Sequence, residues 1–150
     1  MLKHQLLRIL CTILCLTSAE SAAQRDARAD RLASMQRTMP VGAVCAELEW
    51  EPVSYCRFYS QGATLEIWSG LYGPGATLSF DGAGDVGLIL MTVIREHFRL
   101  AGIAVEKLDQ CIRKSATLNI EVADKTFELH CHLVDFAGSL ALEIYPEPGK

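Results

Sequence analysis

Residues 85–101 read DVGLILMTVIREHFRLA, and this stretch carries the clearest helical pattern in the chain. At about 100° per residue, apolar side chains recur on one face and charged side chains on the other. Asp85 is a favourable N-cap, and Gly102 ends the pattern. We therefore predict one long amphipathic helix whose inner face is formed by Val86, Leu90, Val93, Ile94, His97 and Ala101.

The sequence alternates between apolar and polar residues in several segments before and after this helix. Such alternation is typical of strands with one buried face. Before it we predict strands at 44–49, 53–59, 63–68 and 76–80, joined as hairpins. After it we predict a short helix at 106–113 and a three-stranded meander at 117–122, 126–134 and 139–145. This order favours an α+β fold in which an antiparallel β-sheet packs against the one long helix.

The composition limits the class of protein. The 150 residues are 50% hydrophobic and 21% charged, with a formal net charge of -4. These values exclude a disordered polymer and leave room for one packed domain. The mild acidity argues against a nucleic-acid partner, because such proteins need a basic surface to meet the phosphates.

Residues 1–23 have the three parts of a secretory signal peptide, namely a positive start, a short apolar run and small residues at the end. Ser21-Ala22-Ala23 fits a cleavage site before Gln24, and Ala19-Glu20-Ser21 is the alternative. The apolar run is far shorter than the roughly 20 residues that span a bilayer, so we expect no stable membrane anchor after cleavage. The predicted location is the periplasm or the extracellular space.

Residues 24–40 form a separate, basic segment. It holds Arg25, Arg28, Arg31 and Arg37 and offers little apolar surface to bury. We predict a flexible or weakly helical arm that ends at Pro40. A single disulfide-braced α+β domain is expected to follow over residues 41–150.

Four cysteines follow the signal segment, namely Cys45, Cys56, Cys111 and Cys131. An even number of cysteines in an exported domain predicts disulfides, and four allow three connectivities. A hairpin centred on residues 50 and 51 would place Cys45 opposite Cys56, and Cys111–Cys131 would then tie the short helix to the sheet. A zinc site is the rival interpretation, but the chain has no CxxC pair to support it.

Residues 82–87, GAGDVG, match the G-x-G-x-x-G fingerprint of a dinucleotide-binding loop. Two features oppose that function. Asp85 would put a carboxylate inside the phosphate loop, and the residues after the helix do not continue as a second βα unit. We interpret the motif as a strand-to-helix turn and expect no nucleotide cofactor.

The histidines offer a candidate metal site. His130 and His132 share one face of a predicted strand, and such an H-x-H pair can supply half of a metal site. His97 lies in the apolar stripe of the long helix. The three imidazoles would converge if that helix packed on the face with His130 and His132. However, the periodicity turns the apolar face of the strand, not the histidine face, toward the helix.

No catalytic constellation is recognisable, because the serines lie outside nucleophile-elbow patterns and no acidic spacing favours an acid/base pair. The aromatic residues near the first turns, of a kind favoured at protein interfaces, are Trp50, Tyr55, Trp68 and Tyr72. We therefore expect a small exported binding or accessory protein, of inhibitor, immunity or envelope-assembly type, that acts on a protein partner without turnover. The alternative is a metal-binding or metal-dependent exported protein that uses the three histidines.

Overall fold

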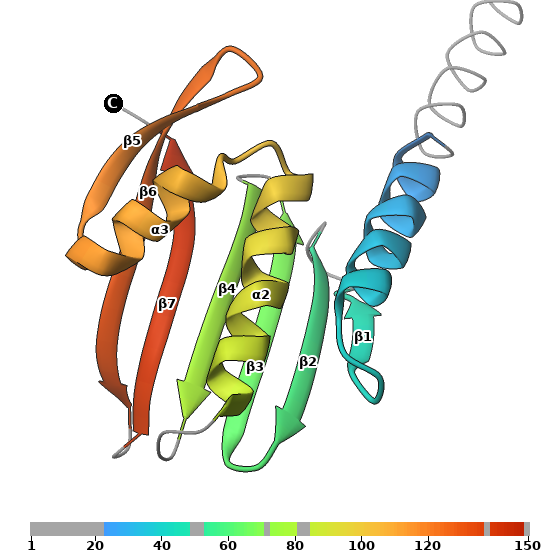
Figure 1. Ribbon diagram of the computed structural model, residues 1–150. Coiled ribbons are helices and arrows are strands. Elements are labelled where there is room, and N and C mark those ends of the chain that lie inside the picture. Colours follow the sequence, from blue (N-terminus) through green and yellow to red (C-terminus); the bar gives the residue numbers. More distant parts are fainter. Residues whose placement is uncertain (1–22, 49–52, 71–72, 81–84, 137–138, 149–150) are drawn as a thin grey trace, which may run out of the picture.

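The computed structural model describes residues 23–48, 53–70, 73–80, 85–136 and 139–148 (Figure 1). The predicted signal peptide therefore lies almost entirely outside the described residues. The strands are β1 (Val44–Glu47), β2 (Ser54–Ser60), β3 (Ala63–Gly70), β4 (Gly73–Phe80), β5 (Thr117–Val122), β6 (Lys125–Phe136) and β7 (Ser139–Pro148). The helices are α2 (Asp85–Leu100), α3 (Val105–Lys114) and an N-terminal helix over residues 23–38.

The seven strands form one sheet in the order β1-β2-β3-β4-β7-β6-β5, and every neighbouring pair is antiparallel. The predicted α+β class with an antiparallel sheet is confirmed. The two halves of the sheet meet where β4 pairs with β7, with Ala76 opposite Ile144. Two segments far apart in the sequence therefore lie side by side at the centre of the sheet (Figure 1).

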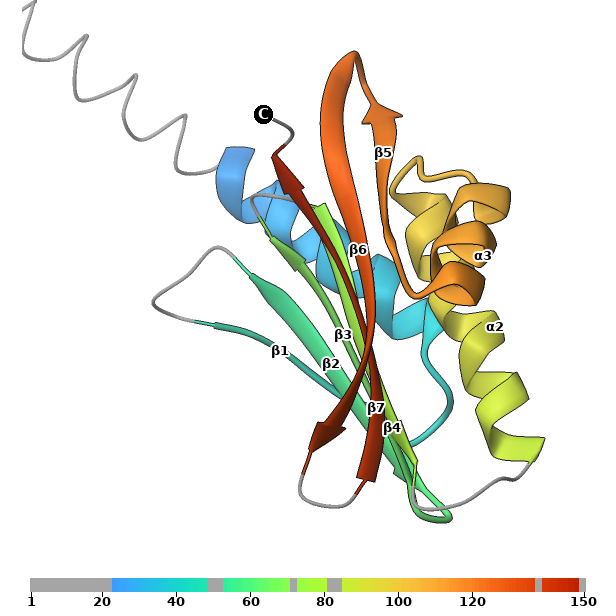
Figure 2. The same ribbon diagram turned by 90° about the vertical axis from the view of Figure 1, so that its left-hand side faces the viewer.

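The core lies between the sheet and the helices, because α2 and α3 cover one side of the sheet (Figure 2). Strand alternation turns Leu65 and Ile67 of β3 toward this side, and both are completely buried. Ile94 and Phe98 of α2 are buried just as fully. We call the opposite side of the sheet, which faces away from α2 and α3, the open face.

The helical layer holds more than the one long helix of the predicted fold class, and α3 corresponds to the short helix expected at residues 106–113. α2 has 16 residues and contacts β3 and β4, whereas α3 has 10 residues and contacts β5 and β6. A helix about 10 Å wide covers only about two strands that are spaced 4.8 Å apart. A seven-stranded sheet therefore needs further helices to cover its apolar side.

Residues 23–38 form a helix and pack, which differs from the flexible or weakly helical arm expected for residues 24–40. Met35 and Met39 are 3% and 7% exposed and belong to the same core cluster as the sheet. Their spacing of four residues places them on one side of a helical turn. The basic composition of this segment obscured the apolar contact that these two methionines provide.

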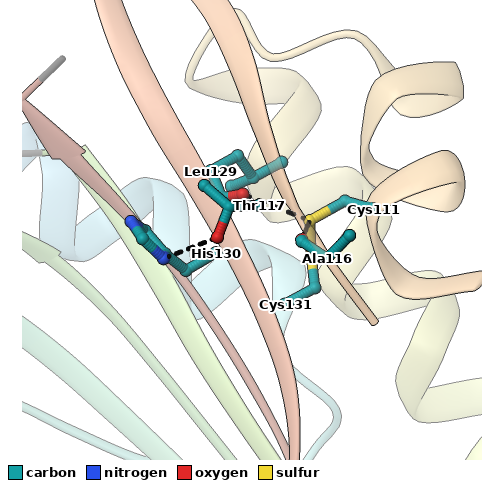
Figure 3. Close-up of a disulfide and its surroundings, with 6 residues drawn as sticks. All are labelled: Cys111, Ala116, Thr117, Leu129, His130 and Cys131. Atoms are coloured by element: carbon teal, nitrogen blue, oxygen red, sulfur yellow. Dashed lines mark hydrogen bonds between the residues drawn. A yellow bond between two sulfur atoms is a disulfide. The ribbon is translucent and has the colours of Figure 1, made fainter. Parts of the chain in front are cut away.

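Two disulfides brace the fold. Cys45–Cys56 joins residues that lie directly opposite each other on β1 and β2. Cys111–Cys131 ties α3 to β6 (Figure 3). These are the two pairs that the sequence favours, and disulfides indicate an oxidising compartment such as the periplasm or the extracellular space. Across the described ranges, no helix has the length and apolar character needed to span a membrane.

Candidate functional site

Trp68 on β3 is the centre of one half of the open face. It lies directly opposite Tyr55 on β2 and Gly75 on β4. A Cβ atom at Gly75 would collide with the Cε2, Cζ2 and Nε1 atoms of Trp68, so the indole lies over the bare glycine. A glycine within a strand thus gives a large aromatic ring room to lie against the sheet.

His97 on α2 forms a hydrogen bond to the backbone of Trp68 from the helix side of the sheet. Its Nε2–H donates a hydrogen bond of 3.0 Å to the carbonyl oxygen of Trp68, and the residue is 5% exposed. Burial lowers the pKa of His97, and backbone hydrogen bonds to Trp68 and Gly75 oppose that shift. His97 is thus a neutral, hydrogen-bonded core side chain that fixes the backbone beneath the indole.

An ion pair accompanies these aromatic residues. Arg57 and Glu66 lie directly opposite each other, and Arg57 Nε donates a hydrogen bond of 2.6 Å to Glu66 Oε1. Burial raises the pKa of Tyr55, and the nearby Glu66 carboxylate raises it further. Tyr55 therefore presents a protonated hydroxyl at neutral pH. We call the surface formed by Tyr55, Arg57, Tyr59, Glu66 and Trp68 the aromatic half of the open face.

His130 on β6 is the centre of the other half. It lies directly opposite Tyr145 on β7, and the two rings stack with centroids 5.1 Å apart and planes 12° apart. The hydroxyl of Thr117 on β5 is 3.0 Å from His130 Nδ1. Figure 3 shows that His130 and Cys131 project from opposite sides of β6, with Cys131 directed toward α3. The His132 ring is 5.7 Å from the His130 ring.

Carboxylates surround His130. Glu128 and Glu147 lie directly opposite each other on β6 and β7. His130 Nε2 is 3.7 Å from Glu128 Oε2 and 3.6 Å from Glu147 Oε2, which is too far for a hydrogen bond. This nitrogen is buried and has no hydrogen-bond partner among the described residues. We call the surface formed by Glu121, Glu128, His130, His132, Glu143, Tyr145 and Glu147 the acidic half of the open face.

The strand register joins the two halves. β4 pairs with β7 through Ala76 and Ile144, and the next step of this register places Tyr145 level with Gly75. Gly75 is in turn the partner of Trp68. Four ring side chains therefore form one row across the open face, in the order Tyr55, Trp68, Tyr145 and His130.

Comparison with protein-family models, with curated proteins and with solved structures gives no match for this chain. Of the predicted interface residues, Tyr55 and Trp68 lie together in the row, whereas Trp50 and Tyr72 lie outside the described residues.

The predicted metal ligands do not come together. His130 and His132 share the open face, whereas His97 belongs to α2 on the other side of the sheet. Among the residues that the structure describes, no three His, Cys, Asp or Glu side chains are grouped so that they could hold a metal ion.

The glycine motif at residues 82–87 lies largely outside the described residues, which resume where α2 begins at Asp85. A dinucleotide fold needs parallel strands on either side of such a helix. All strand pairs in the described sheet are antiparallel.

Sequence reasoning missed Gly75 and Tyr145 as parts of this site. The predicted strands end at residue 68 and resume at residue 76, but β3 continues to Gly70 and β4 begins at Gly73. Glu143, Tyr145 and Glu147 alternate along one strand, and that spacing alone could have identified them as one face.

Proposed function

We propose that this chain is an exported, disulfide-stabilised binding protein that recognises a protein partner through the open face of its sheet. The observation that carries the proposal is the row of Tyr55, Trp68, Tyr145 and His130 across that face. Tyrosine and tryptophan dominate binding energy at protein interfaces because each offers a large contact area with few rotatable bonds.

The row is pre-organised, which supports this proposal. The Trp68 indole rests over Gly75, and His97 holds its backbone from below. His130 is held between the Tyr145 ring and the Thr117 hydroxyl. Side chains that are already ordered lose little entropy when a partner binds, so more of the contact energy remains as affinity.

The breadth of the surface suits a macromolecule. A drug-sized molecule binds best in a concave site that buries most of its surface, whereas a sheet face offers an extended platform. Inhibitor, immunity and envelope-assembly proteins act by covering such a surface on a partner without chemical turnover. Export of the chain is part of the proposal and is supported by the two disulfides and by the signal-like residues 1–23.

Site-specific photo-crosslinking in the cells that naturally make the protein would test the proposal. A photoreactive residue at Tyr59, which is 70% exposed on the open face, should capture a partner protein. The matched control is Leu88 on α2, which is 72% exposed. Capture from Leu88 with none from Tyr59 would contradict the proposed surface.

The captured partner then allows a direct affinity measurement. Truncation of a central aromatic anchor costs about 2 kcal/mol or more, so Trp68→Ala and Tyr145→Ala should each weaken Kd about thirtyfold. Leu88→Ala should leave Kd unchanged. Circular dichroism of each variant separates loss of the anchor from loss of the fold.

The metal-binding alternative has its own measurement. If the chain binds a metal, protein purified without a histidine tag would contain it in stoichiometric amount. A His130→Ala/His132→Ala variant would then lose the metal. Metal-free protein that still binds its partner would support the binding proposal. The metal content of His97→Gln should be measured as well, because His97 lies apart from the other two histidines.

A further inference from the structure

We infer that the partner docks on the acidic half of the open face through a surface rich in arginine or lysine. This inference rests on the proposed function and adds the chemistry of the partner. Three neighbouring strands give the acidic half its charge. β5, β6 and β7 carry Glu121, Glu128, Glu143 and Glu147 on the open face. Lys125 is the only lysine or arginine on these strands, and alternation places it on the opposite face.

Three acidic residues elsewhere in the described part of the chain have an arginine partner, which these glutamates lack. Glu66 on the aromatic half pairs with Arg57. On the helices, Glu96 pairs with Arg99 and Asp109 with Arg95. On the acidic half, by contrast, the recorded ion-pair contacts run only from His130 to Glu128 and Glu147. Cations are thus scarce at this surface, whereas three carboxylates elsewhere in the described residues each have an arginine partner.

The placement of Glu128 and Glu147 gives the surface a specific site for a positively charged group. The two residues lie directly opposite each other on adjacent strands, and like charges in that position repel. His130 Nε2 lies between their carboxylates without bonding to either. A guanidinium or ammonium group from a partner would be attracted to both carboxylates at once.

Charge decides between the possible occupants of this surface. A nucleic acid or an anionic membrane would be repelled by four glutamates. A protein with a basic patch would be attracted, and aromatic anchors could extend across the same face from Tyr145 to Trp68. A second copy of this chain, whose helix over residues 23–38 carries four arginines, is an alternative that the experiment separates.

Nuclear magnetic resonance with a defined probe tests the inference without the natural partner. The probe is a short synthetic peptide with several arginines, added to isotope-labelled protein from Gln24 onward with both disulfides intact. We expect shift changes concentrated on residues 117–121, 128–132 and 143–147, and we expect them to fade as salt is added. A peptide in which glutamate replaces each arginine should produce none.

A double variant and a charge-matched control make the result specific. Glu128→Gln/Glu147→Gln should weaken peptide binding about threefold to tenfold, as expected for the loss of two exposed ion pairs. Glu106→Gln/Asp26→Asn changes the net charge equally but lies on the helices, so it should leave binding unchanged. Equal weakening by both variants, or shift changes spread over all acidic surfaces, would overturn the inference.

Two further outcomes are distinguishable. Salt-sensitive self-association that shifts residues 23–38 without any peptide would assign the acidic half to a second copy and overturn the inference of a separate basic partner. Failure of the peptide test would leave the cross-linking result at Tyr59 untouched. The proposed function and the charge of the partner can therefore fail separately.

Discussion

The indole of Trp68 occupies the space that a side chain at Gly75 would need. The two residues lie opposite each other on β3 and β4, at the middle of the row of rings on the open face. His97 holds the Trp68 carbonyl from the helix side. The position of this aromatic ring therefore depends on contacts with a neighbouring strand and a helix, and each contact can be tested.

Gly75→Ala should displace the Trp68 ring. The new methyl group would force a shift in a packed region, and such overpacking costs about 1–3 kcal/mol of unfolding free energy. Urea unfolding measures the loss, and tryptophan fluorescence in a Trp50→Phe background reports the movement of the ring. Gly87→Ala on α2 is the control, because a Cβ there meets nothing within 4 Å. Removing a glycine from a helix should stabilise the fold by about 0.5–1 kcal/mol.

The burial of His97 should make stability depend on pH. Because burial lowers its pKa in the folded state, the unfolded chain binds the proton more readily. The contribution of neutral His97 is complete above about pH 6.5, the ordinary value, and declines as pH falls from there toward the lowered folded pKa. Urea unfolding at neutral and mildly acidic pH should show this loss in the natural chain, and His97→Gln should show less of it. An identical pH dependence in both proteins would contradict this role.

Removal of the Cys111–Cys131 disulfide should cost more stability than removal of Cys45–Cys56. Its sequence separation is 20 residues against 11, and a longer closed loop restrains the unfolded chain more. Replacing either pair by alanine should lower the unfolding free energy by about 2–4 kcal/mol. Thiol titration of the denatured chain from Gln24 onward should find free thiols only after reduction. Four free thiols without reduction would contradict both bridges.

Glu147→Gln should stabilise the fold at low salt. Glu147 lies directly opposite Glu128, and removing one of two like charges across strands relieves about 0.2–1 kcal/mol of repulsion. Thermal unfolding should show a gain that shrinks as salt is added. Glu106→Gln should show no gain, because Glu106 lies in the first turn of α3, where the helix dipole favours a negative charge. A loss of stability in Glu147→Gln would contradict this prediction, because it would mean that the negative charge of Glu147 makes a net favourable interaction within the fold.

Local patterns along the chain predicted most of the elements. Helical periodicity and a capping residue placed the start of the long helix at Asp85, where α2 begins. A hairpin centred on residues 50 and 51 placed Cys45 opposite Cys56, as in the β1–β2 register. These predictions needed only residues that are close in sequence, because caps and hairpin registers are short-range properties.

Local sequence patterns could not predict the contacts between segments that are far apart in the chain. The packing of Met35 and Met39 depends on a core built by strands and helices that follow much later in the chain. The strand character of Gly73 and Gly75 comes from their pairing with Gly70 and Trp68 of β3, which overrides the turn preference of glycine. The convergence of Glu128, His130, Tyr145 and Glu147 depends on how β6 and β7 are aligned.

The amino-acid sequence by itself determined the class of the fold and the start of the main helix, because these follow from periodicity and from neighbours along the chain. It favoured the observed pairing of the four cysteines but left three connectivities open. Only the tertiary structure decided that β4 pairs with β7. That pairing brings Trp68 and Tyr145 into one row and leaves an acidic surface beside it. The physical reason is that strand pairing joins residues whose separation in the sequence carries no signal of their proximity.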